Sequence, residues 1–410
     1  MNFKSILIGA VSAIAVAGAA QAGSIIVVSW GGAYTKSQVE AYHKPWMVAT
    51  GNTIVSEDYN GGLAEVKAQV EAGNVTWNLV DVELSDAVRG CDEGILEPID
   101  HSLLPPAPDG TPAAEDFIAG ALPECAVANI VWSTIFAYDR SVLGGKSALA
   151  SLDLENTTPA NLRAAIENEV AGADASALSI ADVYSFANIY AKLSPGSGPT
   201  KIADFFDLEK FPGKRGIRKG PKPILEMALM GDGVPADEVY AILETEEGVD
   251  RAFAMLDTIK DATIFWEAGA QPPQLLADGE VVMTTAYNGR IFNAAMAEGK
   301  AFEIVWDGQV LDFDLWVIPK GAPNMKDTLD FLAYSTDTQR LADQASWIAY
   351  GPARKSSGAL VGLFNDGKTP MAPHMPTAEA NMTNALVNGF EFWADNQDEL
   401  NERFNAWLAQ

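Results

Sequence analysis

Four consecutive residues, Tyr287, Asn288, Gly289 and Arg290, are the part of this chain whose types and spacing most suggest chemistry. They follow residues 281–286, an apolar and β-branched run that predicts a buried strand. Asn-Gly is a turn signal, so the strand is expected to end here and to deliver an aromatic ring and a cation at the mouth of a sheet. Open α/β sheets bind ligands at their strand ends, and an aromatic ring there suits a cationic or apolar ligand better than a phosphate.

Common catalytic motifs are absent from the sequence. Residues 196–201 place a lysine after glycines, but the spacing is not that of a P-loop and Pro199 interrupts it. There is no G-x-S-x-G elbow and no H-E-x-x-H motif, and His43, His101 and His374, the only histidines, lack the spacing of metal ligands. We therefore expect no enzyme, metal or cofactor. A secreted hydrolase that uses a pair among the many carboxylates stays open as the alternative class.

Export is predicted by the first 22 residues. Lys4 gives a short positive segment, residues 6–20 are apolar but too few to span a bilayer well, and Ala20 and Ala22 form a small-x-small cleavage site. We expect a signal peptide that is cleaved after Ala22, with a retained anchor as the alternative. Because Gly23 rather than a cysteine follows, lipid attachment is not expected. The mature chain is then periplasmic, and we expect it to be a monomer.

The net charge of the chain limits its possible partners, and its two cysteines predict a disulfide. Fifty-five acidic residues against 27 basic ones give a net charge of −28, which argues against nucleic acid and anionic membranes as partners. The electric field of this charge mildly attracts cationic solutes. A solvated acidic surface with no role in ligand binding explains the charge as well. Cys91 and Cys125 are expected to pair in an oxidising compartment, closing a loop of about 35 residues and stabilising the fold by about 3–4 kcal/mol. Two free thiols are the alternative.

The elements that must position these residues alternate along the chain. Residues 25–30, 53–58 and 77–82 read as strands, separated by helices at 35–42 and 63–72, a β-α-β-α-β order that means a parallel sheet covered by helices. Residues 98–112 and 194–200 are predicted loops. Residues 126–138 read as a long strand that passes from a first lobe to a second, and residues 313–319 as a further strand. Residues 236–260, 338–346 and 378–409 read as helical.

With these features the chain resembles the extracellular solute-binding proteins of ABC importers, and within them the spermidine/putrescine-binding type. The resemblance covers nearly the whole mature chain and rests on the shared order of segments, each weak alone: 79–82 with 94–100, 132–134 with 137–138, 204–215, 271–274 through 289, 314–319 and 350–353.

The resemblance implies an α/β fold of two lobes, the type II periplasmic-binding-protein fold, with a ligand clamped in the cleft between them. Residues 23–135 and 313–357 would form lobe 1, and residues 136–312 and 358–410 lobe 2. Hinge strands are expected near 132–138, 310–314 and 350–357. Closure would present a new surface to a membrane permease. A chemosensory protein that docks a receptor instead is the alternative, because such a protein would show the same sequence features.

The resemblance also implies ligand-contacting residues. Aromatic faces attract an alkylammonium and cover its methylenes, while one carboxylate gives a charge-assisted hydrogen bond. Asp314 matches the carboxylate that grips a terminal ammonium. Glu83 departs from the family's small polar residue. It either contacts an additional amine or pairs with a lysine or arginine, and an acid at a helix N-terminus is the further alternative. Arg290 is predicted to be a structural ion-pair partner rather than a carboxylate clamp. The full candidate set is Trp30, Tyr34, Glu83, Trp132, Trp266, Tyr287, Asp314 and Tyr350, with core packing as the alternative for Trp132 and Trp266.

One departure from the family bears on the ligand. Polyamine binders carry an acidic pair after the segment that ends at Arg218, whereas this chain has Lys219 and Lys222. A long triamine therefore loses its distal partners. We expect a small amine-containing solute such as putrescine. The alternatives are a zwitterion such as a γ-amino acid, or a quaternary onium compound, which aromatic cages also suit.

Overall fold

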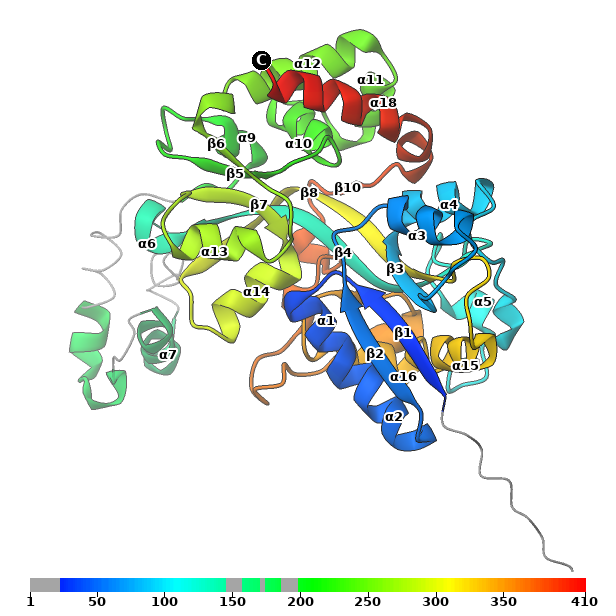
Figure 1. Ribbon diagram of the computed structural model, residues 1–410. Helices are drawn as coiled ribbons and strands as arrows, with labels where there is room; N and C mark the ends of the chain where they lie inside the picture. Colours follow the sequence, from blue (N-terminus) through cyan, green and yellow to red (C-terminus); the bar gives the residue numbers. More distant parts are fainter. Residues whose placement is uncertain (1–22, 145–156, 170–173, 186–197) are drawn as a thin grey trace, which may run out of the picture.

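Two long antiparallel strands, β4 (Ala126–Asp139) and β8 (Phe302–Val317), run through the centre of the molecule (Figure 1). The computed structural model describes residues 23–144, 157–169, 174–185 and 198–410. Its strands form a mixed sheet in the order β2-β1-β3-β8-β4-β7-β5-β6. The two central strands are therefore shared, with a group of parallel strands on each side. The predicted α/β two-lobe fold is confirmed. The other strands are β1 (Ser24–Ser29), β2 (Thr53–Asp58), β3 (Leu79–Glu83), β5 (Arg215–Arg218), β6 (Thr263–Trp266), β7 (Met283–Tyr287), β9 (Gly351–Pro352) and β10 (Leu386–Val387).

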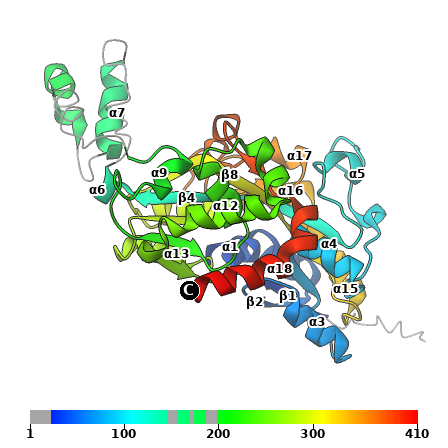
Figure 2. The same cartoon turned by 90° about the horizontal axis from the view of Figure 1, so that it is seen from above.

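The first lobe is built on β1, β2 and β3, which pair in parallel because helices make the crossovers between them. The β-branched residues of β1 give it two apolar faces, as a strand of a parallel sheet requires. β3 is also buried along its whole length, although Asp81 and Glu83 lie on one of its faces. Helices on this lobe appear in blue, cyan and orange in Figures 1 and 2. They are α1 (Gly32–Gln38), α2 (Lys44–Thr50), α3 (Ala64–Glu71), α4 (Leu84–Asp92), α5 (Ala113–Asp116), α15 (Met325–Ser335), α16 (Thr338–Ala345) and α17 (Lys355–Gly358).

The second lobe is built on β5, β6 and β7, which are also parallel. Its core is a separate hydrophobic cluster in which α10, α12 and the C-terminal α18 pack together. Helix α18 also touches α4 of the first lobe, so the two lobes meet away from the sheet as well. The remaining helices are α6 (Arg140–Leu143), α7 (Pro159–Glu169), α9 (Ile202–Phe206), α10 (Ile224–Gly231), α11 (Val239–Leu243), α12 (Glu246–Asp257), α13 (Gln271–Ala277), α14 (Asn288–Met296) and α18 (Phe390–Leu408).

The pairing of β4 with β8 is irregular at two places. Its register shifts between Ala128 and Ile130 and again between Thr134 and Phe136. At the second place Thr134 lies opposite Val310 but Phe136 lies opposite Val305, so β8 carries extra residues there, including Gly308 in the left-handed region. A bulge of this kind bends and loosens a strand pair.

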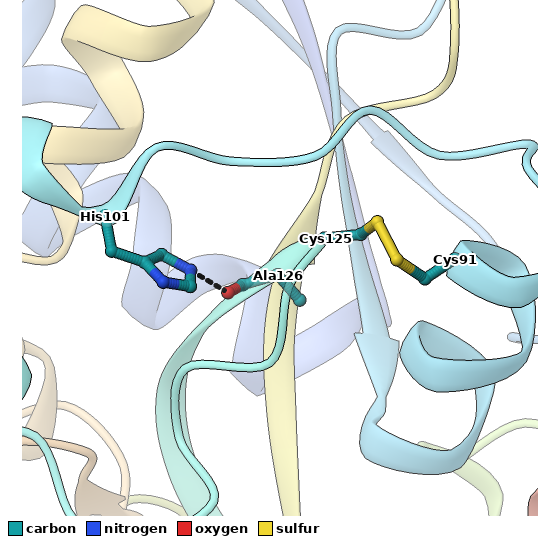
Figure 3. Close-up of a disulfide and its surroundings, with 4 residues drawn as sticks. All are labelled: Cys91, His101, Cys125 and Ala126. Atoms are coloured by element: carbon teal, nitrogen blue, oxygen red, sulfur yellow. Dashed lines mark hydrogen bonds between the residues drawn. A yellow bond between two sulfur atoms is a disulfide. The ribbon is translucent and has the colours of Figure 1, made fainter.

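A disulfide joins Cys91 of α4 to Cys125, which directly precedes β4 (Figure 3). The predicted pairing is confirmed, and the alternative of two free thiols is wrong. Beside it, His101 Nε2 lies 3.0 Å from the carbonyl oxygen of Ala126, at the start of β4. Both contacts fix the point at which the chain enters the long shared strand.

Two local predictions are wrong. Asn288 and Gly289 do not form a turn but open α14, because the Asn288 amide makes long-range hydrogen bonds instead of local ones. It donates to the carbonyl of Ala349 and accepts from the amide of Ser133. The stretch 378–389 is not continuous helix, since it contains β10, which pairs with β8.

Residues 1–22, which carry the predicted signal, and most of the predicted loop at 194–200 lie outside the described residues. In the part of the chain that is described, no helix combines the length and apolar character needed to cross a membrane.

Candidate functional site

A small cavity of about 20 Å³ lies where the two lobes meet along the shared strands. The first lobe contributes the segment after β1, the start of α1, the end of β3 and the residue before β9. The second contributes the end of β7 and the first turn of α14, and β4 and β8 each add one side chain. The structure therefore brings together every predicted site residue except Trp266, and it adds one that was not predicted. The lining residues are Trp30, Tyr34, Glu83, Trp132, Tyr287, Arg290, Asp314 and Tyr350.

Aromatic rings form most of the cavity wall, and they support one another edge to face. The rings of Tyr34 and Tyr350 are 5.5 Å apart and those of Trp132 and Tyr287 are 5.0 Å apart. Trp266 does not line the cavity but packs behind Tyr287 at 5.7 Å. Such contacts stabilise ring positions by about 0.5–1.5 kcal/mol each, so they hold the rings in place. We call the aromatic lining of the cavity, Trp30, Tyr34, Trp132, Tyr287 and Tyr350, the aromatic box.

Asp314 is the free carboxylate of the cavity. It lies on β8 opposite Glu83 of β3 and is 5% exposed, and no cation pairs with it among the described residues. Burial raises the pKa of Asp314 well above its usual value, and the nearby carboxylates of Asp81, Glu83 and Asp312 raise it further. A buried carboxylate without a counter-ion is unfavourable, and a cationic group in the cavity would relieve this.

Behind the box, Asp81 holds Tyr34 in place through a hydrogen-bond network. The Asp81 carboxylate accepts from the side-chain amides of Gln38 at 2.6 Å and of Asn129 at 3.2 Å. Asn129 in turn accepts from the Tyr34 hydroxyl at 3.3 Å. Burial raises the pKa of Asp81 to about 7. Asp81 was not predicted, because nothing local in the sequence marks a fully buried acid within a largely apolar strand.

Glu83 is bound to cations of the protein itself. Its carboxylate lies 2.6 Å from Lys222 Nζ and 3.2 Å from Arg218 Nη1, and both cations come from the second lobe. Burial alone would raise the pKa of Glu83, but the two cations outweigh it and hold the pKa below its usual range. Of the roles predicted for Glu83, the structure therefore contains the ion pair, and Glu83 is also the residue that directly precedes α4 at its N-terminus. Lys219, by contrast, pairs with Glu267 at the surface.

Arg290 is not the ion-pair partner that we expected. Its guanidinium donates to the backbone carbonyl oxygens of Trp30 at 2.9 Å and Gly31 at 3.0 Å, and it lies over the Tyr287 ring at 6.0 Å. No carboxylate pairs with it within the described ranges, and its Nε is buried without an acceptor there. The signal that the sequence offers for Arg290 is its position directly after the strand that ends at Tyr287, where it delivers a cation to the mouth of the sheet.

Two α/β lobes with a small cavity between them are the arrangement of the solute-binding proteins that bind small molecules outside the cytoplasm. The chain belongs to the bacterial extracellular solute-binding protein family, whose model matches residues 39–377. These are the solute-binding components of ABC-type importers. The relatives named below are solute-binding proteins.

Particular relatives narrow the comparison. The chain is 40% identical over 398 residues to the gamma-aminobutyric acid-binding protein of Pseudomonas aeruginosa strain PAO1, covering 97% of this chain and 94% of that protein. The solved structure of the PBP MotA from A. tumefaciens B6 with glucopine is 27% identical, with a TM-score of 0.73 and coverage of 94% and 99%. The solved structure of a GABA receptor is also 27% identical, with a TM-score of 0.69 and coverage of 94% and 98%. The resemblance to the polyamine branch in particular is not confirmed.

Proposed function

We propose that this protein captures a short ω-amino acid of the γ-aminobutyrate type between its lobes and delivers it to an ABC permease. The observation that carries the proposal is the presence of two unpaired, opposite charges in one aromatic box. Asp314 has no cation and Arg290 has no carboxylate among the described residues. A zwitterion supplies a partner to both.

The two ends of such a solute match the cavity chemically. Its ammonium would donate charge-assisted hydrogen bonds to Asp314, and its carboxylate would accept from Arg290. The start of α14 adds a favourable dipole for the anionic end. Between them, Trp132, Tyr287 and Tyr350 would cover the methylenes. The relative that is 40% identical binds gamma-aminobutyric acid according to its name.

This chemistry disfavours the other two ligand classes. The second ammonium of putrescine would meet the guanidinium of Arg290, or else the cations that surround Glu83, so one end of a diamine is always repelled. A quaternary onium compound keeps its charge but has no N–H to give to Asp314, which leaves that carboxylate without a hydrogen bond. We therefore place the zwitterion ahead of the diamine.

Closure is part of the proposal. We propose lobes at 23–135 with 313–357 and at 136–312 with 358–410, which rotate about the irregular pairs of β4 and β8 near Thr134 and Gly308. The residues of the cavity come from both lobes, so full affinity requires the closed form. We further propose that the protein acts in the periplasm as a monomer, after cleavage following Ala22.

The test is calorimetric titration of residues 23–410 with γ-aminobutyrate, putrescine and betaine. We expect γ-aminobutyrate to bind most tightly. In Arg290→Met the loss of a charged hydrogen bond should weaken γ-aminobutyrate about 10- to 150-fold, while putrescine binding stays equal or improves. Lys219→Met, which removes a cation outside the cavity, is the matched control and should change neither. Tighter binding of putrescine than of γ-aminobutyrate by the wild type would refute the proposal.

A further inference from the structure

A buried ion triad, formed by Glu83, Arg218 and Lys222, joins the two lobes. Glu83 is the last residue of β3 in the first lobe, Arg218 is the last residue of β5 in the second, and Lys222 precedes α10. Lys222 Nζ also donates to the hydroxyl of Ser85 at 2.6 Å, a second contact across the cleft. The triad can form only when the lobes are together.

Burial gives the triad an energetic weight that surface pairs lack. The side chains of Glu83, Lys222 and Arg218 are 5%, 10% and 20% exposed. When the lobes separate, all three return to water and need no partner. In the closed form each needs the others, because an uncompensated buried charge is strongly unfavourable.

A second interlobe ion pair offers a contrast. Arg89 of α4 lies 2.9 Å from Asp398 of α18, whose side chain is 87% exposed. Exposed pairs of this kind contribute little, because water and salt screen them. This pair also lies away from the cavity.

The triad also completes the wall of the cavity. Glu83 lines both the cavity and a neighbouring interlobe cleft of about 210 Å³, and Arg218 and Lys222 line that cleft. Arg218 lies over the Tyr287 ring at 6.0 Å. Glu83 thus holds Arg218 and Lys222 at the boundary between the two spaces, beside a ring that the ligand is expected to touch.

We infer that Glu83, Arg218 and Lys222 are positioning residues for ligand binding: they complete the site only on closure and slow the release of the solute by holding the two lobes together. This rests on the proposed function for its probe ligand, γ-aminobutyrate. The carboxylate that grips the amine is Asp314. Glu83 is already saturated by two cations of the partner lobe.

The test is a double-mutant cycle read out as the Kd for γ-aminobutyrate, with Glu83→Gln, Lys222→Met and the double variant. Glu83→Gln leaves two cations together in the closed form and should raise the Kd about 10- to 100-fold. Removing Lys222 as well takes away one of these charges, so the double variant should bind more tightly than Glu83→Gln. Stopped-flow tryptophan fluorescence should show the change in koff and not in kon, because the triad forms after encounter. If Glu83→Gln does not fold, Lys222→Met against the wild type keeps the test, because it leaves Glu83 with Arg218 alone and should raise the Kd for γ-aminobutyrate.

Asp398→Asn is the matched control, since it removes the exposed interlobe pair, and its Kd should stay within about twofold of the wild type. Additive effects in the cycle, or single variants that bind like the wild type, would overturn this inference while leaving the proposed function intact. A wild-type protein that does not bind γ-aminobutyrate overturns the proposed function, and the inference with it.

Discussion

Replacing Asp314 by asparagine separates the stability of this protein from its binding. Asparagine has nearly the same volume but no charge, so the substitution removes the unpaired buried carboxylate of β8. In the wild type, burial and the neighbouring acids raise the pKa of Asp314 above its unfolded value. The folded state therefore binds the proton more strongly, and the group lowers the free energy of unfolding as pH rises through its folded pKa. At neutral pH Asp314→Asn should thus be as stable as the wild type, or more stable.

Binding should change in the opposite direction. The loss of one hydrogen bond between an ammonium and a carboxylate is worth about 1.5–3 kcal/mol, so the Kd for γ-aminobutyrate should rise about 10- to 150-fold. Calorimetric titration gives the Kd, and urea unfolding without ligand gives the stability. Asp312→Asn is the control: Asp312 is also buried and its pKa is raised to about 7, mainly by burial, but it does not line the cavity. If Asp314→Asn bound within about threefold of the wild type, or if Asp312→Asn weakened binding equally, the assignment of Asp314 would be refuted.

Three further predictions concern residues around this site and in the first lobe. In Gly61→Ala the new Cβ would lie 2.3 Å from the Trp30 ring, so the Kd should rise about tenfold or more. Gly62→Ala is the control, because Gly62 has a similar positive φ but open space around it, and this variant should bind normally. Equal Kd values for the two variants in a titration would contradict this prediction. Cys91→Ser removes a disulfide that closes a loop with a sequence separation of 34, so the free energy of unfolding in urea should fall by about 3–4 kcal/mol. The Kd should not change, and an unchanged urea midpoint would count against this prediction. Burial lowers the pKa of His43 from 6.5 to about 4, so the neutral form is favoured in the fold and about 3 kcal/mol of stability is lost as pH falls from 6.5 to 4. His43→Gln should lack this part of the pH dependence, and an unfolding profile parallel to that of the wild type would show that His43 does not titrate in this way.

The fold was predictable because its strands are marked by composition. The β-branched run at β2 gave its bounds without error, and the strand at 126–138 differs from β4 by one residue. β4 is buried along an apolar run, so no competing interaction shifts its ends. β2 is largely exposed, and its bounds follow instead from its β-branched start and from the Asn and Gly residues that flank it. The stretch 378–389 failed because β10 is only two residues long and is held by its pairing with β8, which leaves no local pattern.

The candidate site was partly predictable, for a related reason. Aromatic residues at strand ends, such as Trp30 and Tyr287, can be recognised one by one. The roles of Glu83 and Arg290 could not, because a charged side chain takes its meaning from partners that are far away in sequence. Lys222 reaches Glu83 from the other lobe, and Arg290 finds backbone carbonyls where we expected a carboxylate.

The sequence by itself determined the α/β class, the two-lobe family resemblance, the pairing of the cysteines and most of the aromatic box. These follow from local composition and from the order of segments along the chain. Only the tertiary structure decided which charges are free. Coulombic pairing depends on distances of a few ångströms between lobes, and those distances are set by the way β4 and β8 bring the two halves together. That geometry pairs Glu83 with two cations of the other lobe, and it leaves Asp314 without a cation and Arg290 without a carboxylate among the described residues.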